Sequence, residues 1–279
     1  HSVSAFCNAG FDLMGIKEPF SSLSDYVGNP LINISIMSLI LLGGLGFVTW
    51  QDIAKNKGNF HRYRLQSKII LSTTIFLVLL PALFYFFLEF REMPMESRIL
   101  ASLFTAVTPR TAGFNTVDFS KFSDSGIFLQ ILLMLVGAAP GSTGGGMKMT
   151  TMTVLFLTSV AIFRNNSRTE AFGRTIPGEV IRNATTIAFM YISLCVLSGM
   201  FISLHEHLPL LTTCFETASA IATVGLTLGI TPKLSPVSHM VLIFLMYIGR
   251  VGGLCLIYAV FPNINPNKGR LVEENVIVG

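Results

Sequence analysis

The sequence predicts an all-α membrane protein that crosses the bilayer several times through repeated units. Only 12% of its 279 residues are charged and 51% are apolar, whereas a soluble domain carries roughly 25% charged residues. Long stretches without charge recur along the chain, and a transmembrane helix needs about 20 such residues. A short sequence motif around a glycine also occurs three times. These observations exclude a disordered chain and argue against a soluble enzyme.

The gaps between charged residues predict five membrane crossings. They lie near residues 30–51, 69–88, 126–163, 183–204 and 237–261. The third is too long for one straight helix, so we expect it to be broken. Basic residues concentrate in segments 52–68 and 164–182 and in the C-terminal tail, while the other loops are mixed or acidic. The positive-inside rule therefore places these two segments and the C-terminus in the cytoplasm.

Charge and cysteine content exclude several other classes. The net charge of +4 is too small and too dispersed for a nucleic-acid partner. The four cysteines lie far apart in apolar sequence, which favours buried small side chains over a metal site or disulfides. The N-terminus lacks the basic and apolar regions of a signal peptide, and we expect the chain to begin inside a structural unit.

A glycine-centred phrase follows each outward excursion of the chain. The three phrases span residues 4–12, 104–115 and 215–227, with Gly10, Gly113 and Gly225 at their centres. Moderately apolar stretches at 98–109 and 209–222 precede two of them and are too short to cross a bilayer, so each is expected to be a re-entrant half-helix. The repeated unit is then a helix, a half-helix, a glycine loop and a second helix.

Such loops suit cation binding. Irregular backbone at membrane depth survives only inside protein or along a watery cavity, and glycine allows the positive φ that turns carbonyls toward one axis. Rings of carbonyls can replace the hydration shell of a cation, and the C-terminus of a half-helix adds partial negative charge. The alternative is that these glycines only permit helix packing or tight turns.

These residues resemble the Trk/Ktr/HKT superfamily of potassium transporters, and the bacterial KtrB-like membrane subunit most of all. The resemblance runs almost end to end and is carried by residues 104–117, 138–148 and 249–253. It implies four helix–pore-helix–helix repeats in one chain, arranged like a tetrameric potassium channel. Residues 1–63 would then end the second repeat, 64–172 would form the third, and 173–279 would form the fourth with a cytoplasmic tail. The first repeat and part of the second would be missing, so the chain is expected to be a fragment.

The resemblance also implies an ion filter formed by the glycine loops. The full potassium-channel filter motif Thr-Val-Gly-Tyr-Gly is absent. Each loop has one central glycine, which suggests a simpler filter. The residues expected to bind K⁺, the only metal ion predicted, are Asn8, Ala9, Gly10, Thr111, Ala112, Gly113, Thr223, Val224 and Gly225.

The break in the third crossing is rich in glycine. Its residues are Gly137, Ala138, Ala139, Pro140, Gly141, Ser142, Thr143, Gly144, Gly145 and Gly146. A continuous helix there is disfavoured, because glycine costs about 1 kcal/mol and proline about 3 kcal/mol. A phosphate-binding P-loop fits poorly, since Met147 occupies the lysine position; a simple packing kink is a second alternative. We expect an unwound loop across the pore below the filter, because discontinuous membrane helices mark ion pathways.

Arg250 lies mid-way along the fifth predicted crossing, where an arginine is costly and usually faces a cavity or a partner. No acidic residue lies inside a predicted span, so carbonyls of the glycine-rich loop are the expected partners. Its charge would raise the barrier for cations, although snorkelling to the interface is an alternative. Lys148 is expected near the inner end of the broken helix, and both residues complete the predicted gate.

The predicted function is K⁺ uptake across the bacterial cytoplasmic membrane, with no covalent cofactor and with dependence on Na⁺ left open. The resemblance implies a homodimer in lipid, resting on a cytoplasmic ring of nucleotide-binding RCK-type subunits that would dock on segments 52–68 and 164–182. A Na⁺-coupled carrier with discontinuous helices is the alternative, but only Ser142, Thr143 and Lys148 could bind substrate at the break. An intramembrane enzyme would need a catalytic constellation that the spans lack.

Overall fold

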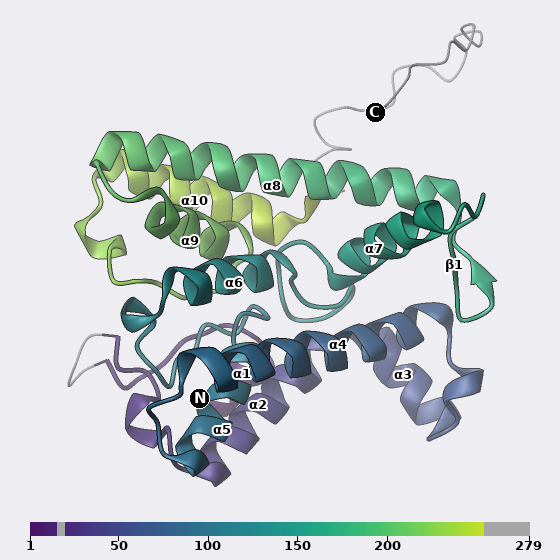
Figure 1. Ribbon diagram of the computed structural model, residues 1–279, viewed down its shortest axis with the longest axis horizontal. Coiled ribbons are helices and arrows are strands. Elements are labelled where there is room, and N and C mark those ends of the chain that lie inside the picture. The colour runs from purple at the N-terminus through teal and green to yellow at the C-terminus, as the bar shows by residue number, and fades with distance from the viewer. Residues whose placement is uncertain (16–19, 254–279) are drawn as a thin grey trace, which may run out of the picture.

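A computed structural model describes residues 1–15 and 20–253 as a bundle of helices with one small hairpin (Figure 1). The N-terminal half contains α1 (Ser2–Phe6), η1 (Ser24–Tyr26), α2 (Pro30–Gly44), α3 (Phe47–Asn56), η2 (Phe60–Arg62), α4 (Leu65–Phe84), η3 (Tyr85–Glu89) and α5 (Met95–Val107). The C-terminal half contains η4 (Phe119–Lys121), α6 (Asp124–Leu135), α7 (Met149–Phe163), β1 (Glu170–Ala171), β2 (Arg174–Thr175), α8 (Gly178–Glu206), α9 (Leu210–Ile221), η5 (Thr231–Lys233) and α10 (Pro236–Val251).

The helices form the repeated unit that the sequence predicts. The short helices α5 and α9 coincide with the expected half-helices; α5 packs on α4 and α2, and α9 packs on α8, α10 and α6. Helices α6 and α7 lie end to end with an irregular loop between them (Figure 1). Residues 136–148 form no helix, so the third expected crossing is broken.

Within residues 1–15 and 20–253, two helical stretches are long and apolar enough to cross a membrane, Leu65–Glu89 and Gly178–Glu206. The first expected crossing, 30–51, is not a single helix: α2 ends at Gly44 and α3 continues at an angle of 96°, and the bent pair counts as a third span only if taken together. The bend occurs at Gly46, whose φ of +83° is one that glycine adopts without a steric penalty. The Trp50 indole then donates back to the Leu42 carbonyl at 3.0 Å.

The fifth expected crossing, 237–261, also differs from a continuous helix. Helix α10 ends at Val251, and Gly252 follows with a φ of +91°. Arg250 therefore lies in the last turn of α10. The rest of that crossing and the predicted cytoplasmic tail lie outside the described residues.

The hairpin of β1 and β2 is an element that the sequence analysis did not predict, because strands of two residues carry no periodic pattern. Its turn contains Phe172, so the predicted boundary between residues 172 and 173 falls inside it. The Phe172 ring lies 5.9 Å from the Phe60 ring, and the Lys68 ammonium lies within 6 Å of both. The hairpin therefore fastens segment 164–182 to segment 52–68.

A carboxylate joins the helix before each of the half-helices α5 and α9 to the helix that follows it. Glu89, at the end of η3, accepts hydrogen bonds from the Ser123 backbone N–H at 2.6 Å and its hydroxyl at 2.8 Å. Glu206, at the end of α8, accepts from the backbone N–H of Ser235 at 3.0 Å and from its hydroxyl at 2.6 Å. Both serines are the N-caps of the helices that follow, α6 and α10.

Replacing Ser235 by alanine tests this joint, because it removes the N-cap of α10 and a donor to Glu206. A lost N-cap costs about 1 kcal/mol, so we expect a lower midpoint of thermal unfolding for the full natural protein in detergent. Ser159→Ala is the matched control, since the Ser159 hydroxyl is exposed and donates only to Leu155 within its own helix. Equal midpoints for the two variants would contradict the joint.

Candidate ion pathway

The three glycine loops meet at one place. A Cβ atom placed on Gly10 would lie 2.8 Å from the Ala112 carbonyl oxygen and 3.4 Å from the Cα of Gly113. A Cβ on Gly113 would lie 2.3 Å from the Val224 carbonyl oxygen, and one on Gly225 would lie 3.9 Å from the Cα of Gly113. Segments about one hundred residues apart in sequence are thus in direct backbone contact.

The loops share one backbone conformation. Gly10, Gly113 and Gly225 have φ values of +72°, +79° and +88°. The residue two positions earlier is left-handed in every case, with φ of +49° at Asn8, +64° at Thr111 and +55° at Thr223. Positive φ is uncommon outside glycine and costs about 1–3 kcal/mol where it is strained. The recurrence of this pattern in three loops of different sequence marks them as structural repeats.

A short helix leads into each loop. Helices α1, α5 and α9 end at Phe6, Val107 and Ile221, a few residues before the glycines. The C-terminus of a helix carries partial negative charge. Three such ends therefore converge on the region where the loops meet.

Polar side-chain atoms without partners line this region. The Asn8 side-chain amide and the hydroxyls of Thr111 and Thr223 are buried, and none makes a hydrogen bond within the described part of the chain. These are the same three residues that have left-handed backbones. Buried polar groups are ordinarily paired, so these oxygens are free to accept a water or a cation.

A cavity of about 530 Å³ opens on one side of the loops and is called the vestibule here. Gly10, Gly113 and Gly225 form part of its wall, together with Asp12, Phe20, Ser21, Ser24, Asn115, Asp118, Phe119, Ser120, Lys121, Leu226, Thr227, Leu228 and Gly229. All three loops thus contribute to one opening.

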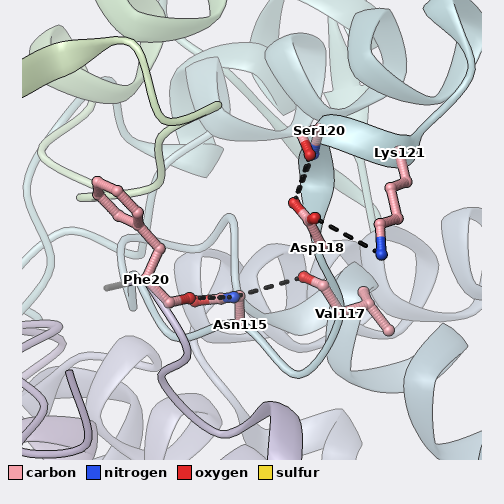
Figure 2. A network of polar contacts seen from close by, with 6 residues as sticks. All are labelled: Phe20, Asn115, Val117, Asp118, Ser120 and Lys121. Carbon is pink, nitrogen blue, oxygen red and sulfur yellow. Dashed lines mark hydrogen bonds and ion pairs between the residues drawn. The ribbon is translucent and has the colours of Figure 1, made fainter. Parts of the chain in front are cut away.

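Figure 2 shows the polar contacts along one wall of the vestibule. The Asn115 side chain donates to the carbonyls of Phe20 at 3.2 Å and Val117 at 3.4 Å. Asp118 accepts from the Ser120 hydroxyl at 2.7 Å and lies 3.9 Å from the Lys121 ammonium. Because Asp118 and Lys121 are both largely exposed, this ion pair adds little stability.

The glycine-rich loop, residues 137–146, lies against the three glycine loops. A Cβ on Gly144 would lie 2.3 Å from the Thr111 hydroxyl oxygen and 3.5 Å from the Asn8 amide nitrogen. A Cβ on Gly145 would lie 2.1 Å from the Thr223 hydroxyl oxygen. Only glycine fits at these two positions, which explains the composition of the loop.

Two basic side chains hold consecutive carbonyls of this loop. Arg250 donates from Nη1 to the Thr143 carbonyl at 3.0 Å, and Lys148 donates from Nζ to the Gly144 carbonyl at 2.7 Å. The expected hydrogen bond between Arg250 and the loop is therefore present. Most of the Arg250 side chain is exposed, whereas Lys148 is partly buried.

Backbone contacts fix the remainder of the loop to its neighbours. The Ala139 N–H donates to the Gly44 carbonyl at 3.0 Å, and the Gly146 N–H donates to the Gly249 carbonyl at 3.1 Å. The Thr143 hydroxyl lies 3.1 Å from the Phe6 carbonyl and can donate to it. The loop thus bridges the helices that follow the first and third glycine loops, α2 and α10.

The structure brings the three glycine loops together with Gly144 and Gly145 of the predicted gate, whereas Pro140 and Gly141 lie against Gly46 and Phe47 at the bend between α2 and α3. Three other residues at these contacts were not among those predicted. Gly43 and Gly249 sit on α2 and α10, and a Cβ on each would lie 1.9 and 2.0 Å from the carbonyl oxygens of Phe6 and Ile221, the last residues of α1 and α9. Their glycine-rich surroundings, 43–46 and 249–253, were a usable signal. Glu216 is the third: it accepts hydrogen bonds from the segment after Gly225, and its neighbours in sequence gave no sign of these contacts.

A repeated helix, half-helix and glycine loop, with an unwound segment packed against the loops, defines a membrane protein of pore-loop fold. The chain belongs to the TrkH family, described as cation transport proteins, whose family model matches residues 1–266. This confirms the predicted superfamily.

Relatives agree with this assignment. The chain is 38% identical over its whole length to the potassium/sodium uptake protein NtpJ of Enterococcus hirae and 36% identical to Ktr system potassium uptake protein B of Bacillus subtilis. It spans 63% and 62% of the lengths of these proteins. These relatives are uptake proteins, so the family is one of transporters and not of enzymes.

A solved structure confirms the predicted fold class. The potassium transporter TrkH from Vibrio parahaemolyticus superposes with a TM-score of 0.71 at 19% identity. The match covers 93% of this chain and 57% of that one. At this identity the likeness establishes the fold alone.

Gly145→Ala tests the fit of the glycine-rich loop. The added methyl group must displace the loop or Thr223, and overpacking of this kind costs roughly 1–3 kcal/mol. We expect a lower midpoint of thermal unfolding in detergent. Gly178→Ala is the control, because a Cβ there meets nothing within 4 Å and its φ is not positive. If both variants unfold at the parental temperature, the loop does not pack as described.

Proposed function

We propose that the protein conducts K⁺ across a bacterial cytoplasmic membrane through the filter formed by its glycine loops. The main support is the meeting of Gly10, Gly113 and Gly225 in one conformation, next to buried oxygens that lack partners. The names of the relatives, potassium and potassium/sodium uptake proteins, agree with a monovalent cation as the permeant ion.

An ion would enter from the vestibule, where Asp12 and Asp118 favour cations. It would exchange its hydration shell for carbonyl oxygens of residues 8–10, 111–113 and 223–225, because such a ring can replace water at little cost. The side chains of Asn8, Thr111 and Thr223 would supply the next oxygens along the path. Flow follows the electrochemical gradient, since the sequence offers no nucleotide-hydrolysing motif.

The glycine-rich loop would act as the gate. Its close approach to Thr111 and Thr223 leaves no room for a side chain, and therefore little for a hydrated ion. Arg250 and Lys148 both neutralise the loop carbonyls and repel cations. Opening requires the loop to leave the filter and these two hydrogen bonds to break.

The assembly we propose is a homodimer in lipid with a cytoplasmic C-terminus, regulated by a ring of RCK-type subunits. Segments 52–68 and 164–182 would form the docking surface, since the hairpin and Lys68 join them into one. The third and fourth repeats would span residues 64–172 and 173–279.

Ion flux into liposomes tests the transport proposal. The full natural protein is reconstituted, and uptake of K⁺, Rb⁺ and Na⁺ is compared with that of empty vesicles. We expect K⁺ and Rb⁺ to exceed Na⁺ without any Na⁺ requirement. K⁺ uptake that depends strictly on Na⁺ would favour the coupled carrier, and absence of cation uptake would refute the proposal.

Gly113→Ser tests the filter. Its φ of +79° disfavours serine, and the new Cβ would collide with the Val224 carbonyl, so we expect the K⁺/Na⁺ uptake ratio to fall by about tenfold, equivalent to about 1.4 kcal/mol. Gly173→Ser is the matched control, because Gly173, in the turn of the β1–β2 hairpin, also has positive φ but meets nothing within 4 Å. An unchanged ratio in Gly113→Ser at equal membrane abundance would remove Gly113 from the filter.

Arg250→Gln tests the gate. The glutamine retains donors for the Thr143 carbonyl but lacks the positive charge. We expect K⁺ to leak about tenfold faster than in the parent, which corresponds to a barrier lower by about 1.4 kcal/mol. Arg182→Gln, at an exposed position on α8, serves as the control. Parental flux in Arg250→Gln would show that this charge does not restrain the ion.

A further inference from the structure

Glu216 is a buried carboxylate on α9 that supports the wall of the vestibule. Its side chain is 4% exposed. Oε1 accepts hydrogen bonds from the Thr227 hydroxyl at 2.6 Å and the Leu228 N–H at 2.9 Å, and Oε2 accepts from the Thr231 hydroxyl at 2.7 Å. No lysine or arginine in the described residues forms an ion pair with it. The carboxylate is therefore bound entirely by the loop that follows Gly225.

The bonded loop is part of the opening above the filter. Thr227, Leu228 and Gly229 line the vestibule next to Gly225. Thr227 also accepts a hydrogen bond from the Gly229 N–H at 2.9 Å, so the Glu216 contact extends along the wall. Since Gly225 lies only two residues before Thr227, the conformation of residues 227–229 constrains the position of the Gly225 loop.

The same position differs in the other two loops. Glu216 lies nine residues before its glycine and binds the N–H three residues after it. His1 occupies that place before Gly10, and its Nε2 accepts from the Leu13 N–H at the longer distance of 3.4 Å. Phe104 occupies it before Gly113 and lies in an apolar cluster with Phe114. Among these three loops, only the Gly225 loop, which belongs to the fourth predicted repeat, is bound by a carboxylate at this position.

We propose that Glu216 is a positioning residue that sets the shape of the Gly225 loop and, through it, the preference for K⁺ over Na⁺. The claim about ion preference rests on the proposed function, whereas the claim about the shape of the loop does not. Hydrogen bonds to charged groups are stronger than those between neutral groups. Three of them converge on the one buried carboxylate of Glu216, whereas His1 accepts one hydrogen bond from its loop and the Phe104 side chain can accept none.

Two measurements on the full natural protein test this role. The first is amide hydrogen exchange over residues 226–231, and the second is the K⁺/Na⁺ uptake ratio in liposomes. The variants are Glu216→Leu, which removes all three acceptor contacts, and Glu216→Gln, whose amide oxygen still accepts from Thr227 and Leu228. Thr231→Val removes one contact only. Glu96→Gln, on an exposed glutamate of the equivalent half-helix α5, is the control.

We expect Glu216→Leu to exchange faster over residues 226–231 and to lower the K⁺/Na⁺ ratio by about tenfold at equal membrane abundance. Glu216→Gln keeps two acceptor contacts but loses the charge, and Thr231→Val loses one contact, so both should lie between the parent and Glu216→Leu. If Glu216→Leu fails to reach the membrane, Thr231→Val carries the same test. Unchanged exchange, or a ratio that stays parental while exchange increases, would overturn the proposal.

The two proposals fail in different ways. A parent protein without K⁺ uptake would refute the proposed function, while faster exchange in Glu216→Leu would still identify Glu216 as the anchor of this loop. A selective parent whose ratio is equal in the Leu and Glu96→Gln variants would refute the role of Glu216 alone.

Discussion

Backbone-to-backbone contact at the meeting point of the loops is the constraint on which the structure depends. The gap between Gly113 and the Val224 carbonyl admits no Cβ atom, and neither does the gap between Gly145 and Thr223. Such contacts demand glycine, and glycine alone cannot hold a loop in one conformation because its backbone is so free. The order must therefore come from the surrounding helices, their carboxylate joints and the side chains that bind the loops.

The helices supply that order through a shared plan with local differences. Around both α5 and α9, neighbouring helices enclose the half-helix, and a glutamate from the preceding helical segment binds the N-cap serine of the helix that follows. Close packing of Gly249 against the end of α9 brings Arg250 to the glycine-rich loop. Neighbouring residues of α10 thus contact both the end of α9, through Gly249, and the glycine-rich loop, through Arg250.

Much of this architecture could be predicted from the sequence because it rests on composition and on recurrence. The half-helices, the break at 137–146 and the convergence of the glycine loops follow from charge gaps and from a repeated phrase. The bend at Gly46 and the end of α10 at Val251 were not predicted, because the expected crossings were drawn from gaps between charged residues and the glycines at 43–46 and 249–253 were not used as helix ends. The role of Glu216 was equally hidden, because its partners lie 11 to 15 residues away around a loop.

The unlike residues that precede the loops, His1, Phe104 and Glu216, have an evolutionary consequence. In an assembly of identical subunits one mutation alters every wall of a pore at once. Here the walls are separate stretches of one chain, so each can drift alone while its neighbours keep the opening intact. In the pore proposed above, ion preference would therefore change in small steps, one wall at a time, along mutational routes that a symmetric pore does not have.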